Sequence, residues 1–173
     1  AASDVYKRQV FGFGRHGRCC NLAVCGLSPH SYAACSAPAD FCYICNMDVI
    51  GFREFCLSLP FAEECTPFDE TTLVYKVGGR MFAYADMVCF NRFAVKCDPV
   101  QAEILRDRYP EVTPAWHSNK RHWNDVRTDG DLPEEFLRRQ IRDSYMLVLR
   151  RNVTPRSLRE EILSYIAGMG LEW

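Results

Sequence analysis

The sequence contains no long hydrophobic run and no large excess of charge of either sign. No stretch approaches the roughly 18 consecutive apolar residues that a membrane-spanning helix needs, so neither an integral membrane protein nor a membrane partner is expected. The formal net charge is −1 over 173 residues, which removes the simplest argument for a nucleic-acid-binding protein, a strongly basic chain. Apolar residues make up 48% of the chain, and this content favours a folded protein over a disordered one.

Cysteine is too scarce for a disulfide scaffold and is unevenly distributed. Ten cysteines in 173 residues are about 6%, below the roughly 8–10% typical of such scaffolds. Six lie within residues 1–46, and the other four are Cys56, Cys65, Cys89 and Cys97. The spacing of these four predicts reduced core thiols in a cytoplasmic protein. A single Cys42-x-x-Cys45 pair is a weak zinc signal, so neither a metal site nor a cofactor is expected.

The composition of the chain changes near Met47. Residues 1–46 show neither helical nor strand periodicity, whereas regular patterning with caps and turns begins after that point. The hexapeptide from Asp4 to Gln9 resembles the translated mosaic-end adapter of transposase-based sequencing libraries. We therefore predict that residues 1–46 are non-native read-through and largely disordered, and that residues 47–173 form the natural domain.

Apolar periodicity after Met47 predicts an α+β domain with helices packed on one face of an antiparallel sheet. A three-stranded meander is expected over residues 71–77, 80–88 and 93–97, with Gly78-Gly79 as its first turn. A further strand is expected within residues 116–128. Helices are expected to begin at Asp48, Asp98, Asp131 and Thr154.

Several side chains receive specific positions in this prediction. Residues 61–70 are acidic and are expected to form a turn. Met81, Ala83 and Ala85 are expected on one face of their strand, and Ile104 and Leu105 on the inner face of their helix. An apolar stripe at helical spacing is formed by Leu137, Ile141, Tyr145 and Val148.

The densest group of polar and aromatic residues is the segment 116–123, Trp-His-Ser-Asn-Lys-Arg-His-Trp. Its hydrogen-bond donors suit phosphate oxygens and base edges, and its indoles can stack on bases. Residues 76–127 carry nine Lys or Arg against six Asp or Glu, so positive charge is concentrated around this segment. A solvated polar face over core tryptophans is an equally good interpretation.

The predicted hairpins carry a weaker signal of the same kind. Lys76 and Arg80 flank Gly78-Gly79, and Arg92 and Lys96 flank the next strand. Cations at hairpin tips can contact a DNA backbone, but they also protect sheet edges from aggregation.

An enzyme is not expected. His117 and His122 lack the spacing of a helical zinc motif, and the chain has neither a nucleophile elbow nor a phosphate-cradling glycine loop. His117 with Lys120 remains a possible acid–base pair.

Larger pieces of the chain resemble the MmcQ/YjbR family of small bacterial proteins. The matching pieces are 47–60, 74–83, 96–99, 109–114, 117–123, Leu132-Pro133 and Ser144-Tyr145. The resemblance covers nearly all of residues 47–173 and none of 1–46. Ser118 departs from the pattern, which often has an apolar residue such as Met there.

This resemblance implies a two-layer fold similar to frataxin and CyaY, and a DNA-binding function with paired hairpin wings. The residues that it assigns to DNA contact, together with the cations beside them, are Lys76, Arg80, Lys96, His117, Asn119, Lys120, Arg121, His122 and Trp123. Two alternatives stay open. One is a small-molecule- or protein-binding module with Trp116, His117 and Trp123 lining a pocket, and the other is iron handling of the frataxin kind through carboxylates.

Overall fold

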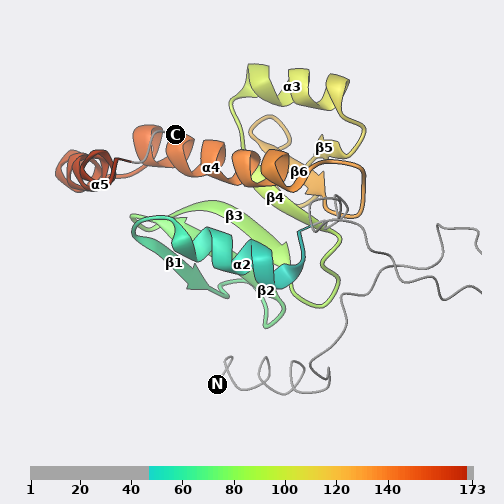
Figure 1. The fold of residues 1–173 in the computed structure, drawn as a ribbon, viewed down its shortest axis with the longest axis horizontal. Helices are drawn as coiled ribbons and strands as arrows, with labels where there is room; N and C mark the ends of the chain where they lie inside the picture. Colours follow the sequence, from blue (N-terminus) through green and yellow to red (C-terminus); the bar gives the residue numbers. More distant parts are fainter. Residues whose placement is uncertain (1–46, 171–173) are drawn as a thin grey trace, which may run out of the picture. The chain divides into compact units, whose positions relative to one another are not determined.

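A computed structural model describes residues 47–170. The prediction that residues 1–46 are read-through lies outside these residues. Within residues 47–170, six strands form one antiparallel sheet in the order β1-β2-β3-β4-β6-β5, and four helices accompany it (Figure 1). The strands are β1 (Ala62–Cys65), β2 (Thr72–Val77), β3 (Arg80–Asp86), β4 (Arg92–Lys96), β5 (Val112–Pro114) and β6 (Trp123–Arg127). The helices are α2 (Val49–Ser58), α3 (Pro99–Arg108), α4 (Glu134–Arg151) and α5 (Arg156–Gly168).

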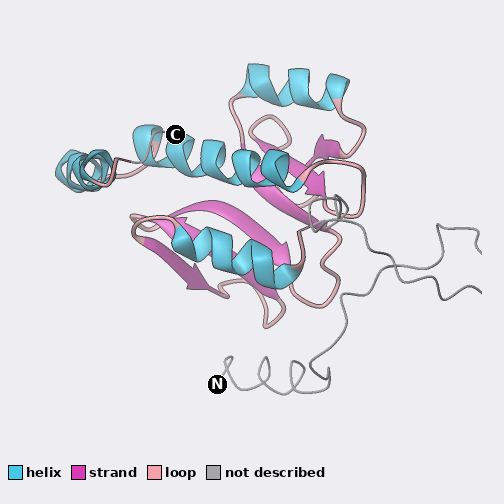
Figure 2. Ribbon diagram, in the orientation of Figure 1, coloured by secondary structure: helices cyan, strands magenta, loops and turns pink. Residues whose placement is uncertain are grey.

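Helices α2 and α4 lie over one face of the sheet, as predicted, and α5 lies beyond the end of the sheet (Figure 2). Helices α2, α4 and α5 contribute to a single core cluster with the inward side chains of the strands. The predicted stripe on α4 is fully buried, and Phe52 of α2 stacks on Phe93 of β4 at 5.0 Å between ring centroids. The α+β class is therefore confirmed. No helix among the described residues is long and apolar enough to span a membrane.

Local sequence signals set most element boundaries. The Asp48 carboxylate accepts a hydrogen bond from the Gly51 N–H at 2.7 Å and caps α2, and Asp98 caps α3 in the same way. Gly78 and Gly79 both have positive φ, as the tight turn between β2 and β3 requires. The three-stranded meander is confirmed by the pairing of β2, β3 and β4.

Two short strands escaped the sequence analysis. Strand β1 lies in the segment expected to be a turn, and β5 precedes the segment expected to be a strand. Both are at the edges of the sheet, where half-exposed side chains blur the alternation that identifies a strand.

A β-bulge overturns one predicted face. The register between β2 and β3 shifts at Tyr75/Lys76, so that Phe82 has no partner on either neighbouring strand. Ala83 and Ala85 face the helices, whereas Met81 packs with Tyr84 on the opposite face of the sheet. The prediction that all three side chains share a face is wrong because the extra residue reverses the alternation.

Two other positions were predicted incorrectly. Ile104 is 50% exposed, because α3 covers the sheet near β5 and β6 with Ala102 and Leu105 rather than with Ile104. Cys89 is exposed in the β3–β4 loop, so it is not a core thiol, whereas Cys56 is fully buried.

Candidate functional site

The loop of residues 115–122 is the connection between β5 and β6. The two strands pair antiparallel, and the Ala115 N–H donates to the Trp123 carbonyl at 3.0 Å, which closes the base of the loop. At its tip the Asn119 side-chain oxygen accepts from the Arg121 N–H, and the Asn119 carbonyl accepts from the His122 N–H. The loop therefore folds back on itself as a compact turn.

Two neighbouring elements fix the position of this loop. The Tyr84 hydroxyl on β3 and the Ser118 hydroxyl form a hydrogen bond of 2.9 Å. The Arg106 guanidinium on α3 donates to the carbonyls of Lys120 and Trp123 and, at 2.9 Å, to the Asn124 side chain. Ser118 thus ties the loop to strand β3 through its hydroxyl.

The predicted site residues gather at one end of the sheet. Antiparallel pairing brings together the end of β2, the start of β3, the end of β4 and the start of β6. These four points carry Lys76, Arg80, Lys96 and Trp123, and the β5–β6 loop adjoins them. Sequence spacing alone could not show that these residues lie at the same end of the sheet, because Arg80 and Lys120 are 40 positions apart.

The 115–122 loop separates two hollows. One, of about 370 Å³, lies against the end of α4, and we call it the helix-end hollow. Its lining includes Lys96, Asn119, His122, Trp123 and Asn152. The other, of about 790 Å³, is the far-face groove, on the sheet face away from the helices, and Trp116, His117 and Ser118 line it. The predicted pocket of Trp116, His117 and Trp123 is therefore split, because Trp123 lies in the other hollow.

Lys96 is the charged centre of the helix-end hollow. Its Nζ donates to the Asn152 side-chain oxygen at 3.2 Å. Burial lowers the pKa of Lys96, and the nearby positive charge of Arg80 lowers it further. Two cations are thus held near each other, which is costly unless an anion joins them.

Within residues 47–170, the cations assigned to DNA contact lack the carboxylate partners that half of the other Lys and Arg side chains have. Within residues 47–170, six Arg side chains pair with carboxylates: Arg53, Arg127, Arg138, Arg142, Arg151 and Arg156. In the same residues, no carboxylate ion pair is made by Lys76, Arg80, Lys96, Lys120 or Arg121. The Lys120 ammonium instead lies over the Trp116 ring, 5.7 Å from its centroid.

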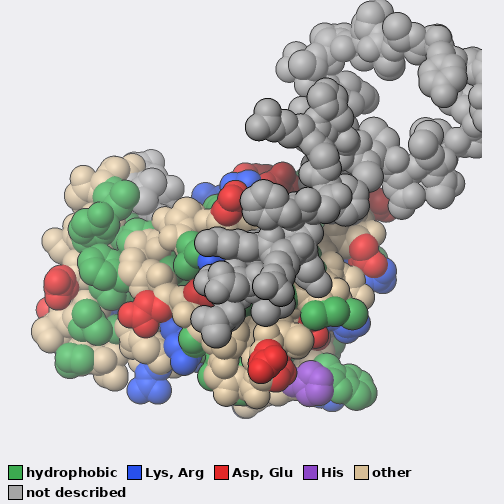
Figure 3. Space-filling view, turned by 90° about the horizontal axis from the view of Figure 1, so that it is seen from below, with side chains coloured by type: hydrophobic (Ala, Val, Ile, Leu, Met, Phe, Trp, Pro, Cys, Tyr) green, Lys and Arg blue, Asp and Glu red, His purple; other side chains and the backbone are tan. Residues whose placement is uncertain are grey.

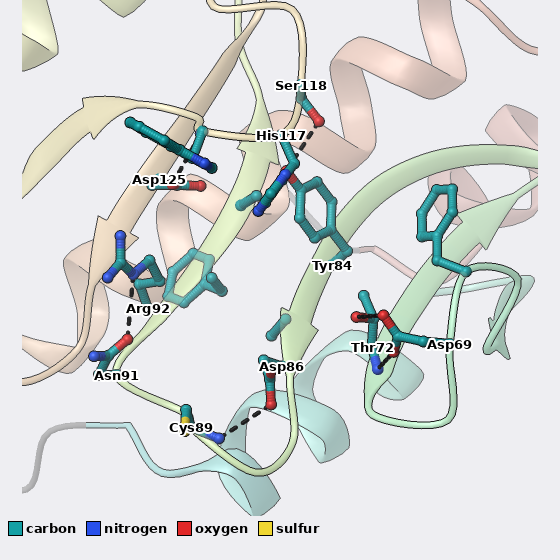
Figure 4. Close-up of a pocket in the computed structure, with 15 residues that line it drawn as sticks. Asp69, Thr72, Tyr84, Asp86, Cys89, Asn91, Arg92, His117, Ser118 and Asp125 are labelled. Carbon is teal, nitrogen blue, oxygen red and sulfur yellow. Dashed lines mark hydrogen bonds between the residues drawn. The ribbon is translucent and has the colours of Figure 1, made fainter.

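The far-face groove contains a carboxylate that the sequence analysis did not single out. Figure 4 shows Asp125 on β6 facing the groove with His117 and Arg92 nearby, and Asp86 and Tyr84 along β3. Burial raises the pKa of Asp125, while the Trp116 N–H, Arg92 and His117 oppose that rise. The one available signal was the polar pair Asn124-Asp125 within a strand, and it does not reveal which face each side chain occupies.

Carboxylates and thiols do not gather into a metal site in the described part of the chain. Within residues 47–170, no group of three His, Cys, Asp or Glu side chains is placed to hold a metal ion. On α2, where frataxin-like iron handling would need clustered acids, Arg53 pairs with Glu64 at 2.6 Å. Burial also raises the pKa of Cys97 to about 11, which keeps this thiol protonated and a poor ligand at neutral pH.

Comparisons with known proteins find similar sequences and folds. The family model described as YjbR matches residues 57–147. An uncharacterized Escherichia coli protein, YbdF, is 35% identical over 98 residues, which span 56% of this chain and 80% of YbdF. The uncharacterized Escherichia coli protein YjbR is 33% identical over 116 residues, 66% of this chain and 96% of YjbR.

Two solved structures share the fold. The crystal structure of a Deinococcus radiodurans protein with a DUF419 domain has a TM-score of 0.63 and 37% identity, covering 68% of this chain and 88% of that one. A Pseudomonas syringae protein has a TM-score of 0.51 with 22% identity, covering 58% and 98%, and this likeness concerns the fold alone.

Proposed function

Because this chain belongs to the YjbR family, we propose that it is a non-enzymatic, DNA-binding protein of the bacterial cytoplasm. The contact surface is the end of the sheet that carries the β2–β3 hairpin, Lys96 and the tip of the 115–122 loop. We call it the cationic end, and its members are Lys76, Arg80, Lys96, Asn119, Lys120, Arg121 and His122. His117 and Trp123 support it from either side of the loop.

The observation that carries this proposal is the absence of carboxylate ion pairs at the five cations of this surface within residues 47–170. A surface cation that is paired with a carboxylate gains less binding free energy from a phosphate, because the existing ion pair must first be broken. Unpaired cations keep their full attraction for an anion and release counterions when they meet a DNA backbone.

The scaffold of the cationic end supports the same function. Asn152 orients Lys96, and hydrogen bonds within the loop and from Arg106 hold the segment from Asn119 to His122 in place. Phosphate contacts position a protein on a duplex without reading its sequence. The proposal therefore includes backbone binding and no sequence preference.

Iron handling of the frataxin kind has less support in the described residues. It would need exposed carboxylates that converge, and residues 47–170 show no such group.

The experiment is fluorescence anisotropy of a labelled DNA duplex titrated with the full chain over a salt series. The test variant combines Lys120→Ala with Arg121→Ala. The control combines Arg127→Ala with Arg138→Ala, which removes the same charge from two arginines already paired with Asp129 and Glu134.

We expect the wild-type affinity to fall steeply with salt, and the log–log slope to decrease by about 2 in the test variant, close to 0.9 for each lost phosphate contact. The control variant should keep the wild-type slope. Absence of binding at about 50 mM salt, or an equal loss in both variants, would overturn the proposal.

A further inference from the structure

The far-face groove has a chemistry opposite to that of the cationic end. It is lined by the three carboxylates Asp69, Asp86 and Asp125, against one permanent cation, Arg92. Such a surface repels a DNA backbone and attracts positive charge. The groove is thus a separate feature of the molecule, which the DNA-binding proposal leaves without a role.

Asp125 has spare hydrogen-bonding capacity. Only 6% of this residue is exposed. The hydrogen bond that it accepts within residues 47–170 comes from the Trp116 N–H to Oδ2 at 3.3 Å, a long contact. A carboxylate can accept about four hydrogen bonds, so its Oδ1 in particular is available to a ligand.

Arg92 and His117 favour the ionised form of this carboxylate through their charge, but neither forms an ion pair with it within residues 47–170. Arg92 donates from Nε to the Asn91 side chain at 3.2 Å and makes no ion pair with Asp125. Tyr84 directs its hydroxyl to Ser118. The remaining two acids in the groove are engaged locally, because Asp69 and Asp86 accept hydrogen bonds from backbone N–H groups of their own turns. Asp125 is therefore the buried acid of the groove that has unused capacity, whereas Asp69 and Asp86 are exposed.

Aromatic side chains supply apolar surface to the same groove. Trp116 is 74% exposed and Phe68 is 67% exposed, and both line it together with Tyr84. Figure 3 shows one face of the molecule, on which hydrophobic, acidic and basic side chains are interspersed. Aromatic faces attract cations as well as apolar groups, and a buried carboxylate next to them favours a ligand that carries both features.

We propose that the far-face groove binds a small organic cation, an amine or amidine attached to an apolar ring. Its N–H groups donate to Asp125, and its ring packs against Trp116 and Tyr84. The cation supplies a direct ion-pair partner, which the carboxylate does not have within residues 47–170, and the volume of about 790 Å³ is sufficient for a ligand of this size. This inference is independent of DNA binding, because the two surfaces have opposite charge.

The test uses benzamidine as the probe, with benzamide as its neutral analogue of the same shape, and isothermal titration of the full chain at pH 7. We expect benzamidine to bind at millimolar or lower concentration and benzamide about tenfold more weakly. Asp125→Asn should weaken benzamidine binding about tenfold, whereas Asp107→Asn, which removes an exposed carboxylate of α3, should leave it unchanged.

Trp116→Ala provides a second variant, because this exposed side chain can be removed without opening the core. We expect it to weaken benzamidine binding severalfold while the thermal unfolding curve stays the same. No heat of binding at about 10 mM benzamidine, equal affinity for benzamidine and benzamide, or unchanged affinity in both Asp125→Asn and Trp116→Ala would overturn the proposal.

Discussion

Ser144 joins helix α4 to the sheet at the point where the β-bulge interrupts strand pairing. The residue is fully buried, and its hydroxyl donates to the Phe82 carbonyl at 2.5 Å and accepts from the Lys96 N–H at 2.8 Å. Phe82 has no partner across either neighbouring strand, and Lys96 lies just beyond the last β3–β4 pair. One hydroxyl therefore satisfies two backbone groups that the ladder leaves open.

Ser144→Ala would leave both groups buried and without a partner. Each unsatisfied group costs about 1–3 kcal/mol, so we expect the free energy of unfolding to fall by about 2–6 kcal/mol. That loss is a large part of the roughly 5–15 kcal/mol that stabilises a typical domain. It also releases the backbone of Lys96, so the variant should weaken DNA binding as well if the cationic end acts as proposed.

Urea denaturation followed by circular dichroism measures this loss. With a slope of about 2 kcal/mol per molar urea, the midpoint should decrease by roughly 1–3 M. Ser164→Ala is the matched control, because Ser164 is exposed on α5 and its replacement should change stability by less than about 0.5 kcal/mol. A midpoint for Ser144→Ala equal to that of the control would refute the reasoning that one hydroxyl completes the sheet at the bulge.

Two further predictions concern the turn and the groove. Gly78→Ala should destabilise the fold more than Gly79→Ala in the same denaturation assay. A Cβ at Gly78 would lie 2.7 Å from Val153 Cγ1, whereas a Cβ at Gly79 meets nothing within 4 Å. Equal losses of stability in the two variants would show that the positive φ alone decides the cost. Because burial raises the pKa of Asp125, ionisation of this group costs the folded state more than the unfolded one, so the contribution of Asp125 to stability should fall as the pH rises from about 4 through its folded pKa. Asp125→Asn should remove this fall from a series of melting temperatures against pH, and an unchanged profile would contradict the assignment.

The sequence by itself determined which segments become helices and which become the central strands. The caps at Asp48 and Asp98 depend on residues within one turn, and the Gly78-Gly79 turn depends on the conformational freedom of those two residues alone. The buried stripe of α4 follows from the 3.6-residue period, which fixes the inward face before any partner is known. Such features are local, so they can be read from neighbouring residues.

The tertiary structure decided where the site residues meet. The bulge at Phe82 places the Met81 side chain on the opposite side of the sheet from the one predicted. An extra residue in a strand cannot be recognised from the local sequence pattern. Lys76, Lys96 and the 115–122 loop were singled out from composition and resemblance, but their meeting at one end of the sheet follows from strand order. Strand order arises from pairing between distant segments, so it is absent from any short window of sequence.

The division of the 116–123 segment shows the same limit most clearly. Its composition indicated one binding cluster, yet the loop directs Trp116 and His117 into an acid-lined groove and His122 and Trp123 toward Lys96. Asp125 received no role from sequence, because only the fold buries it beneath Trp116 and leaves its second oxygen open. Residue types determined what chemistry was available, and long-range packing determined which residues share each surface, because charge and burial depend on neighbours in space rather than in the chain.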